Sequence, residues 1–360
     1  MRAAIYHGAF KPMTVESIDM DQPRAHEVVV RTIGSGVCHS DYHYVDGSLP
    51  MVTPAVLGHE ASGIVEEVGD EVSTVRPGDH VVVCFNAWCG QCEQCLLGHP
   101  TLCLRRPLRT PDDPPQLTWN GDRLGGSVSQ INAFAEKMLL HERQVARIPE
   151  EMPLDVAALI GCAVMTGVGA AINTAAVKPM STVAVFGIGG VGISAIQGAL
   201  LAGARRIVAV DVSAHKLDVA RRFGATHTVD ASQEDVVERV VSICGDGGAD
   251  YSFDVAPGAP TATQQCIEVL KPRGVATIIG GSSEGLKSAD IRFKERTVQG
   301  CLMGSNRFAL DIPHIVEMYM AGRLKLDEMV GRRGGLDEIN DLFDELGRGE
   351  EGRRVVVFDG

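Results

Sequence analysis

The sequence has little positive charge for its length: among 360 residues, 33 Lys and Arg stand against 46 Asp and Glu, a formal net charge of −13. An acidic chain has no electrostatic footprint for DNA, RNA or an anionic membrane surface, so we expect none of these as a partner. Hydrophobic residues make up 45% and charged residues 22%, which argues against an intrinsically disordered chain. Because a single core stops growing near ~250–300 residues, the length predicts two domains.

Membrane-directed segments are also missing. The N-terminal sequence MRAAIYHGAFKPM has no apolar h-region of the kind found in secretory signals, so we expect a cytoplasmic protein. The stretch Thr182–Ala204 carries no charge, but several glycines interrupt it. A strand followed by a helix explains this apolar stretch better than a transmembrane span does.

The pattern of apolar residues changes near Pro153. Before it, short strands without intervening helices predict an antiparallel, barrel-like domain at Glu27–Thr32, Ala61–Val68 and His80–Phe85. After it, apolar strands alternate with helical patterns, which is typical of a parallel doubly wound sheet. The strands of this second part are expected at Thr182–Phe186, Arg206–Val210, His227–Val229, Tyr251–Val255 and Val275–Ile279, and its helices at Leu154–Cys162, Gly167–Thr174 and Ala214–Phe223.

The C-terminal stretch predicts helices at Pro313–Ala321 and Leu336–Gly347 and a final strand at Arg354–Phe358. We expect this tail to return to the first domain.

Four of the ten cysteines lie within a short segment, in the pattern C-x2-C-x2-C-x7-C formed by Cys89, Cys92, Cys95 and Cys103. Four thiolates at this spacing can close a tetrahedron around Zn²⁺. An iron–sulfur cluster uses similar spacing, but nothing else in the sequence indicates electron transfer. We therefore predict a structural zinc site whose four positions are all filled by protein.

Three further groups have the right chemistry for a second metal: Cys38 in GVCHSD, His59 in GHE and Cys162 in GCAVMTG. Each is weak evidence alone, because a single Cys or His is usually structural. Their spacing cannot prove that they meet, although two cysteines, one histidine and a water form a known catalytic zinc sphere.

A G-x-G-x-x-G motif lies between a predicted strand and a predicted helix, at Gly187, Gly189, Gly190, Val191 and Gly192. Its glycines permit a tight turn, close approach of a pyrophosphate and close packing of helix on strand. Asp211 ends the next strand, where a carboxylate would accept from the adenosine ribose and repel a 2′-phosphate. The motif therefore favours NAD over NADP. Lys216 lies near enough along the chain to contact the same ribose.

Taken together, GVCHSD, GHEASGIVEEVG, CGQCEQC, GCAVMTG and GIGGVG occur in the order found in zinc-dependent medium-chain alcohol dehydrogenases, which the sequence resembles over essentially its full length. The resemblance implies an α/β fold with a GroES-like catalytic domain (residues 1–163), a Rossmann NAD-binding domain (164–305) and a C-terminal part of the catalytic domain (306–360). It also implies two zinc ions per chain, the catalytic one on Cys38, His59 and Cys162.

The resemblance further implies roles for individual residues. Ser40 would accept the substrate proton, and His43 would stand at the far end of the relay, reached through the nicotinamide ribose. Glu60 would sit behind the catalytic zinc, and Asp41 would orient His59. The remaining positions are Thr166 at the nicotinamide, Phe85 in the wall of the substrate pocket, and Arg353, with Arg354 as the alternative register, at the pyrophosphate.

One position departs from the family pattern. His39 stands where an arginine often contacts the pyrophosphate, and a histidine loses its charge near pH ~6–7. This predicts pH-sensitive and relatively fast release of NADH.

The activity that the resemblance implies is NAD-dependent oxidation of primary alcohols to aldehydes, and the reverse. The alternatives are a thiol-adduct formaldehyde dehydrogenase, a dismutase-like relative with tightly bound NAD, and a non-catalytic protein.

A strand at Val298–Met303 lies where the family pairs its subunits, so we expect a homodimer or homotetramer. The Pro-rich segment Arg105–Asp122 is expected to be a loop, with Trp119 either reaching the pocket or covering surface.

Overall fold

The computed structural model describes residues 1–126, 129–280 and 286–358, and the chain forms two compact units. The first consists of Met1–Cys162 and Arg307–Gly360 and is called the catalytic unit, after the role that the resemblance implies. The second consists of Ala163–Asn306 and is called the coenzyme unit for the same reason. These limits lie one residue from the expected domain boundaries, and the C-terminal stretch belongs with the N-terminal one.

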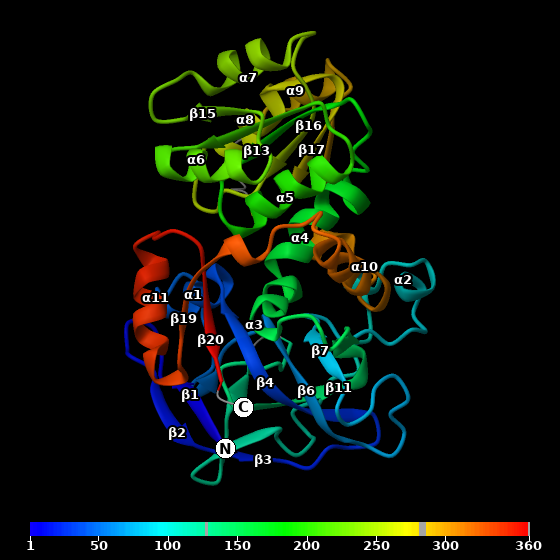
Figure 1. Cartoon of the computed structure of the whole chain (residues 1–360), viewed down its shortest axis with the longest axis vertical. Coiled ribbons are helices and arrows are strands. Elements are labelled where there is room, and N and C mark those ends of the chain that lie inside the picture. Colours follow the sequence, from blue (N-terminus) through cyan, green and yellow to red (C-terminus); the bar gives the residue numbers. More distant parts are fainter. Residues whose placement is uncertain (127–128, 281–285, 359–360) are drawn as a thin grey trace. The chain divides into compact units, whose positions relative to one another are not determined.

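The largest sheet of the catalytic unit has the strand order β12-β7-β6-β4-β20-β19, with β11 also pairing β4 (Figure 1). Every pairing in it is antiparallel except β19 with β20. The strands are β4 (Glu27–Val37), β6 (Ala61–Val68), β7 (His80–Val83), β11 (Lys137–His141), β12 (Val145–Arg147), β19 (Val330–Gly334) and β20 (Arg353–Val357). Because Arg354 pairs with Val37, the last strand of the chain ends up beside the end of β4, where Cys38 follows.

Two smaller sheets complete this unit, with the orders β10-β5-β1-β2 and β3-β8-β9. Their strands are β1 (Arg2–Tyr6), β2 (Thr14–Ser17), β3 (Asp19–Met20), β5 (Ala55–Val56), β8 (Leu117–Trp119), β9 (Asp122–Arg123) and β10 (Gly125–Gly126). The expectation of a loop at Arg105–Asp122 is therefore wrong for its last part. Trp119 packs against the apolar cluster that contains Ile5 and Leu117, which secures this end of the segment.

The helices of the catalytic unit are short except for α10, which begins at Phe308 and not at the predicted Pro313. They are α1 (His39–Val45), α2 (Glu93–Leu96), α3 (Leu154–Ala157), α10 (Phe308–Met320) and α11 (Ile339–Gly347), with 3-10 turns at Pro100–Leu102, Glu142–Gln144, Ala158–Gly161, Asp327–Met329 and Leu336–Glu338. The helix expected at Leu154–Cys162 thus divides into α3 and a 3-10 turn that ends just before Cys162.

The coenzyme unit contains one parallel sheet with the order β15-β14-β13-β16-β17-β18 (Figure 1). Counted along the chain this is 3-2-1-4-5-6, the order of a dinucleotide-binding doubly wound sheet. The strands are β13 (Thr182–Phe186), β14 (Arg206–Asp211), β15 (His227–Asp230), β16 (Ala249–Asp254), β17 (Leu270–Ile278) and β18 (Thr297–Gly300). The predicted Rossmann sheet is confirmed.

The helices of this unit are α4 (Ala163–Gly169), α5 (Gly190–Leu201), α6 (Ala214–Arg222), α7 (Val236–Cys244), α8 (Ala262–Glu268) and α9 (Ser288–Arg292), with a π-helical turn at Ala170–Thr174 and a 3-10 turn at Met303–Ser305. Three predicted boundaries are wrong by several residues. The helix expected at Gly167–Thr174 begins at Ala163, the strand expected at Val275–Ile279 begins at Leu270, and the strand expected at Val298–Met303 ends at Gly300.

Helix α11 attaches the C-terminal segment to the catalytic unit. Its buried side chains Ile339, Leu342, Phe343 and Leu346 have the i, i+3, i+4, i+7 spacing of an amphipathic helix. The ring of Phe343 packs edge-on against fully buried Phe134, with the ring centroids 5.7 Å apart. This apolar contact joins two segments that lie far apart in the sequence.

In the part of the chain that the structure describes, no single helix is long and apolar enough to cross a membrane. One bent pair, Leu154–Gly161 with Ala163–Thr174, meets the length and composition criteria.

We expect Phe134→Ala to lower the free energy of unfolding of the catalytic unit by about 3–5 kcal/mol, because it removes a fully buried aromatic ring. Both tryptophans, Trp88 and Trp119, lie in this unit. Urea unfolding followed by tryptophan fluorescence therefore reports on it. Phe10, whose side chain is 82% exposed, provides the control Phe10→Ala, which should change stability little. Equal effects of the two substitutions would contradict this account of the C-terminal attachment.

Candidate active site

Cys38, His59 and Cys162 meet in the catalytic unit. Cys38 lies between the end of β4 and the start of α1, His59 follows β5, and Cys162 follows the 3-10 turn at Ala158–Gly161. All three are buried, and their ligand atoms lie within 4.8 Å of one another. The structure therefore brings together three residues whose spacing in the sequence could not show that they meet.

The protonation of these side chains is strongly coupled. A hydrogen bond with the Cys162 thiol, together with the neighbouring His59, lowers the pKa of Cys38 well below its ordinary value. The same hydrogen bond and burial raise the pKa of Cys162. Cys38 is thus the sulfur that ionises more readily. A bound metal cation would displace the thiol proton of Cys162, because metal ligands must be deprotonated.

Asp41 fixes the orientation of the His59 ring. Its Oδ2 lies 2.9 Å from His59 Nδ1, and its Oδ1 accepts a hydrogen bond from the backbone N–H of Gly58 at 3.1 Å. Burial alone would lower the pKa of His59, but the Asp41 carboxylate and the Cys38 sulfur raise it well above the ordinary value. With Nδ1 facing Asp41, Nε2 is left to face the two sulfurs. A carboxylate behind a metal-binding histidine has this geometry.

Glu60 and Arg353 form a buried ion pair beside the two cysteines. Arg353 Nη2 donates to Glu60 Oε2, and neither side chain is more than 9% exposed. Glu60 is not one of the three residues whose ligand atoms converge, so its place is behind the site and not in the ligand set. Burial opposes the charge of Arg353, but Glu60 and the two cysteines raise the pKa of its guanidinium.

Arg353 and Arg354, the two candidates for the pyrophosphate-binding arginine, have different surroundings in the structure. Arg354 Nε lies 3.3 Å from Glu345 Oε2, and its Nη1 donates to two backbone carbonyls. Arg353 is therefore the arginine beside the three-ligand site. Its predicted contact with a coenzyme pyrophosphate stays a prediction.

Helix α1 carries the residues of the expected proton relay. Ser40 is exposed, with its Oγ 3.8 Å from Cys38 Sγ. His43 lies three residues further along, on the same face of the helix. Its ring is about a third exposed, and its Nδ1 lies 3.8 Å from Asp46 Oδ2. His39 is exposed and contacts the ring of Tyr42.

Phe85 lies against the ligand histidine. Its ring meets that of His59 edge-on, with the centroids 5.7 Å apart, and the side chain is only partly buried. This position beside His59 is compatible with the predicted aromatic wall of a substrate pocket.

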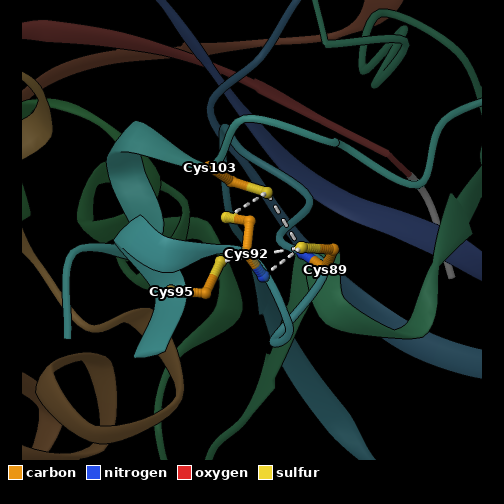
Figure 2. A group of neighbouring side chains, drawn as sticks. All are labelled: Cys89, Cys92, Cys95 and Cys103. Carbon is orange, nitrogen blue, oxygen red and sulfur yellow. Dashed lines mark hydrogen bonds between the residues drawn. The ribbon is translucent and has the colours of Figure 1, made fainter. Parts of the chain in front are cut away.

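The four clustered cysteines form a second group in the same unit, and Figure 2 shows their side chains converging on one point. Cys89 Sγ lies 4.0 Å from Cys95 Sγ, and Cys92 Sγ lies 4.0 Å from Cys103 Sγ. A tetrahedral zinc with arms of ~2.3 Å requires sulfurs ~3.8 Å apart. The donor set therefore fits zinc closely.

Backbone N–H groups prepare the sulfurs of this cluster for a cation. Donors from Leu104 and Cys95 lower the pKa of the Cys92 thiol to about 6. N–H groups of Gln91 and Cys92 lower the pKa of Cys89. Burial raises the pKa of Cys95 to about 12. Thiolates are the form that binds metal, so these donors lower the cost of loading the site.

The cluster also has a supporting residue that the sequence analysis missed. The Arg143 guanidinium lies over the Trp88 ring, 4.9 Å from its centroid, and donates to the carbonyls of Trp88 and Cys89. Arg143 thereby attaches the start of the cysteine loop to the segment between β11 and β12. Because Arg143 lies far from the cysteines in the sequence, no local pattern indicated this contact.

The glycine motif has the expected geometry within the coenzyme unit. Gly187 has φ +92°, and a Cβ at Gly192 would collide with the carbonyl of Gly187. A Cβ at Gly189 would meet nothing, so this part of the loop is open to a ligand. The carboxylate of Asp211 accepts hydrogen bonds from the N–H groups of Ile188 and Ser213. Asp211 is thus held at the edge of the loop, where its predicted contact is the ribose.

Two further predicted coenzyme residues, Lys216 and Thr166, lie in the same unit. Lys216 is partly buried in the first turn of α6, and its N–H donates to the N-capping Ser213. Thr166 is buried on α4, with its Oγ1 3.8 Å from Met303 Sδ. Their contacts with a coenzyme remain predictions.

Comparisons with known proteins agree with this geometry. Family models of an alcohol dehydrogenase GroES-like domain and a zinc-binding dehydrogenase match residues 24–150 and 190–317. An NDMA-dependent alcohol dehydrogenase from Amycolatopsis methanolica is 34% identical over 365 residues, 99% of this chain and 98% of that protein.

Solved structures give the same result. An alcohol dehydrogenase zinc-binding domain protein from Burkholderia ambifaria matches with a TM-score of 0.94 and 33% identity over 100% of this chain and 99% of that one. Benzyl alcohol dehydrogenase from Acinetobacter calcoaceticus matches with a TM-score of 0.93 and 29% identity over 99% of each chain. The chain belongs to the zinc-dependent medium-chain dehydrogenase family. Within that family it is an alcohol dehydrogenase.

Asp41→Asn should weaken zinc binding at the three-ligand site about 10–100-fold. An amide that keeps its oxygen on Gly58 N–H turns its NH₂ group toward His59 Nδ1, which disfavours the tautomer with a free Nε2. Competition between the protein and a coloured chelator measures this affinity. Asp337→Asn, at a carboxylate whose side chain is 70% exposed, is the control. Equal zinc retention in both variants would contradict the orienting role of Asp41.

Cys38→Ala and Cys95→Ala should each lower the zinc content from two ions per chain to one, with different consequences. Cys38→Ala should abolish turnover and leave the thermal midpoint nearly unchanged. Cys95→Ala should lower the thermal midpoint, because the cysteine loop depends on its metal for folding. Metal analysis and thermal unfolding of the same samples test this division. Identical behaviour of the two variants would show that the two sites are not functionally distinct.

Proposed function

We propose that this alcohol dehydrogenase oxidises primary alcohols to aldehydes, and catalyses the reverse, with NAD as hydride acceptor. The convergence of Cys38, His59 and Cys162 beside the exposed hydroxyl of Ser40 is the observation that carries this proposal. Three protein ligands leave one tetrahedral position for water or substrate, as in catalytic zinc sites.

Zinc held there would act as a Lewis acid that lowers the pKa of a bound alcohol and polarises the carbonyl of the product. The protein groups around it have defined tasks. Asp41 holds His59 in one tautomer, and the Arg353 guanidinium compensates the buried carboxylate of Glu60. Phe85 provides an apolar surface next to His59 that excludes water from one side.

The proton of the alcohol leaves through α1. Ser40 accepts it, because its hydroxyl stands beside Cys38 and is open to solvent. His43, three residues along the same helix face, is the group expected at the far end of the relay, where the proton is released to water. The partly exposed His43 ring supports this last step.

NAD, when bound, would accept the hydride at its nicotinamide ring. The open backbone at Gly189 and the N-terminus of α5 support pyrophosphate binding. The Asp211 carboxylate favours NAD because it would repel a 2′-phosphate. A zinc-binding dehydrogenase from Sinorhizobium meliloti, 28% identical over 99% of both chains with a TM-score of 0.81, was solved with NADP, so this preference has to be measured.

A second candidate is favoured by the name of one relative. The Amycolatopsis methanolica protein is described as NDMA-dependent. A chain that retains its NAD through successive turnovers would need a second compound to reoxidise it, as in the dismutase-like alternative. The thiol-adduct formaldehyde dehydrogenase activity remains a third candidate.

The benzyl alcohol dehydrogenase relative supports a primary alcohol as substrate. The position of β18 at the edge of its sheet supports pairing of two copies of the chain, as expected for a dimer.

The deciding experiment supplies zinc-loaded protein with primary, secondary and aromatic alcohols, and with formaldehyde plus a thiol. Either NAD or NDMA serves as oxidant. NADH formation from primary alcohols with free NAD would support the proposal. Turnover with NDMA as the only added oxidant, together with release of a nicotinamide coenzyme on denaturation, would instead support the second candidate, an enzyme that retains its NAD. Turnover only with the thiol adduct would select the third.

A further inference from the structure

The segment after β18 has an unusual backbone conformation. Met303, Gly304 and Ser305 all have positive φ, at 51°, 68° and 49°. Left-handed backbone normally occurs at single residues, because it is unfavourable for residues with a Cβ. Such a run persists only when its surroundings impose it, and strained backbone of this kind concentrates at functional sites.

Asn306 imposes this conformation. It is 1% exposed, and its amide Nδ2 donates to the carbonyl of Met303 and, at 2.7 Å, to the carbonyl of Met165 on α4. The amide of Asn173 donates in turn to Asn306 Oδ1 and Gly304 O, both at 3.4 Å. One side chain therefore ties the left-handed turn to the helix beside it.

Backbone packing reinforces the tie. A Cβ at Gly304 would collide with Met165 O, and a Cβ at Gly169 would collide with Gly304 O. Ser305 Oγ forms a further hydrogen bond with Thr174 Oγ1 at 2.8 Å. The turn and α4 are in direct contact and are held there at several points.

This assembly touches both parts of the predicted coenzyme site within its unit. Met303 Sδ lies 3.8 Å from the hydroxyl of Thr166, the residue expected at the nicotinamide. The next residue of α4, Gly167, packs against Val191 of the glycine motif so closely that a Cβ would collide with Val191 O. The turn also follows the carboxyl end of a parallel strand, the edge at which such sheets bind ligands.

We propose that Asn306 is a positioning residue for the nicotinamide end of the coenzyme. It holds the left-handed turn at Met303–Ser305 against α4 and thereby fixes the surface around Thr166. The adenosine and pyrophosphate are held separately, by Asp211 and the glycine motif. This inference rests on the proposed function, because it requires a nicotinamide coenzyme.

The test compares NADH with ADP-ribose, which has the adenosine and pyrophosphate but no nicotinamide. Asn306→Ala should weaken NADH binding about tenfold and ADP-ribose binding less than about twofold. Fluorescence titration measures NADH, and its displacement measures ADP-ribose. If coenzyme copurifies with the wild-type chain, the dissociation rate of NADH chased by ADP-ribose replaces its Kd, with the same expected ratio.

Ser252→Ala is the matched control. Ser252 is fully buried in β16 and donates to Cys266 O, so the substitution also removes a buried hydrogen bond from the same unit. It should lower the thermal midpoint without changing the ratio of the two affinities. If Ser252→Ala changes the ratio of NADH to ADP-ribose affinity as much as Asn306→Ala does, Asn306 has only a structural role.

A second variant keeps the test valid if Asn306→Ala does not fold. Ser305→Gly removes the hydrogen bond that attaches the turn to Thr174, while glycine adopts φ 49° without strain. It should weaken NADH selectively, about threefold, while the fold is kept. Unchanged NADH binding, or an equal loss of NADH and ADP-ribose binding, would overturn the inference. Wild-type protein that binds neither compound would instead refute the proposed coenzyme.

Discussion

The antiparallel pairing of β20 with β4 is the constraint on which the catalytic unit depends. It brings the end of the chain beside Cys38 and buries Arg353 against Glu60. Without that guanidinium, Glu60 would be a fully buried carboxylate next to two cysteines. A buried carboxylate without a compensating cation destabilises the fold by about 3–5 kcal/mol. The C-terminal segment is therefore part of the metal site's electrostatics as well as of the core.

Even with Arg353 in place, negative charge exceeds positive charge around the three ligands. Asp41 and Glu60 are both buried, and a metal-binding form adds two thiolates. A hydrogen bond with Cys162 lowers the pKa of Cys38, and the same hydrogen bond together with burial raises the pKa of Cys162. A divalent cation held by both sulfurs would compensate the negative charge of two thiolates. The donor set thus selects a cation on grounds of charge as well as geometry.

Local patterns were readable from the sequence, and contacts between distant segments were not. The glycine motif, its flanking β13 and α5, and the four-cysteine loop each lie within a short stretch, so spacing predicted them. The three-ligand site joins Cys38 and His59 to Cys162, which lies far along the chain from both, and only the family resemblance placed these residues together. Arg143 under the cysteine loop and the pairing of Glu60 with Arg353 gave no local signal. β8 was missed because prolines and charges dominate the segment before it.

The two predicted metal sites use the same kind of ligand, and the number of protein donors distinguishes them. Around Cys89, Cys92, Cys95 and Cys103 the protein would supply every position of a tetrahedron, so a zinc bound there would have no open position and would only hold the loop. At Cys38, His59 and Cys162 one position is left over, and the exposed Ser40 stands on α1 immediately after the first ligand. Since α1 begins directly after Cys38, the same helix carries Ser40 and His43, the two residues proposed for proton transfer. The proposed chemistry and the proposed proton transfer are thus linked by one short helix.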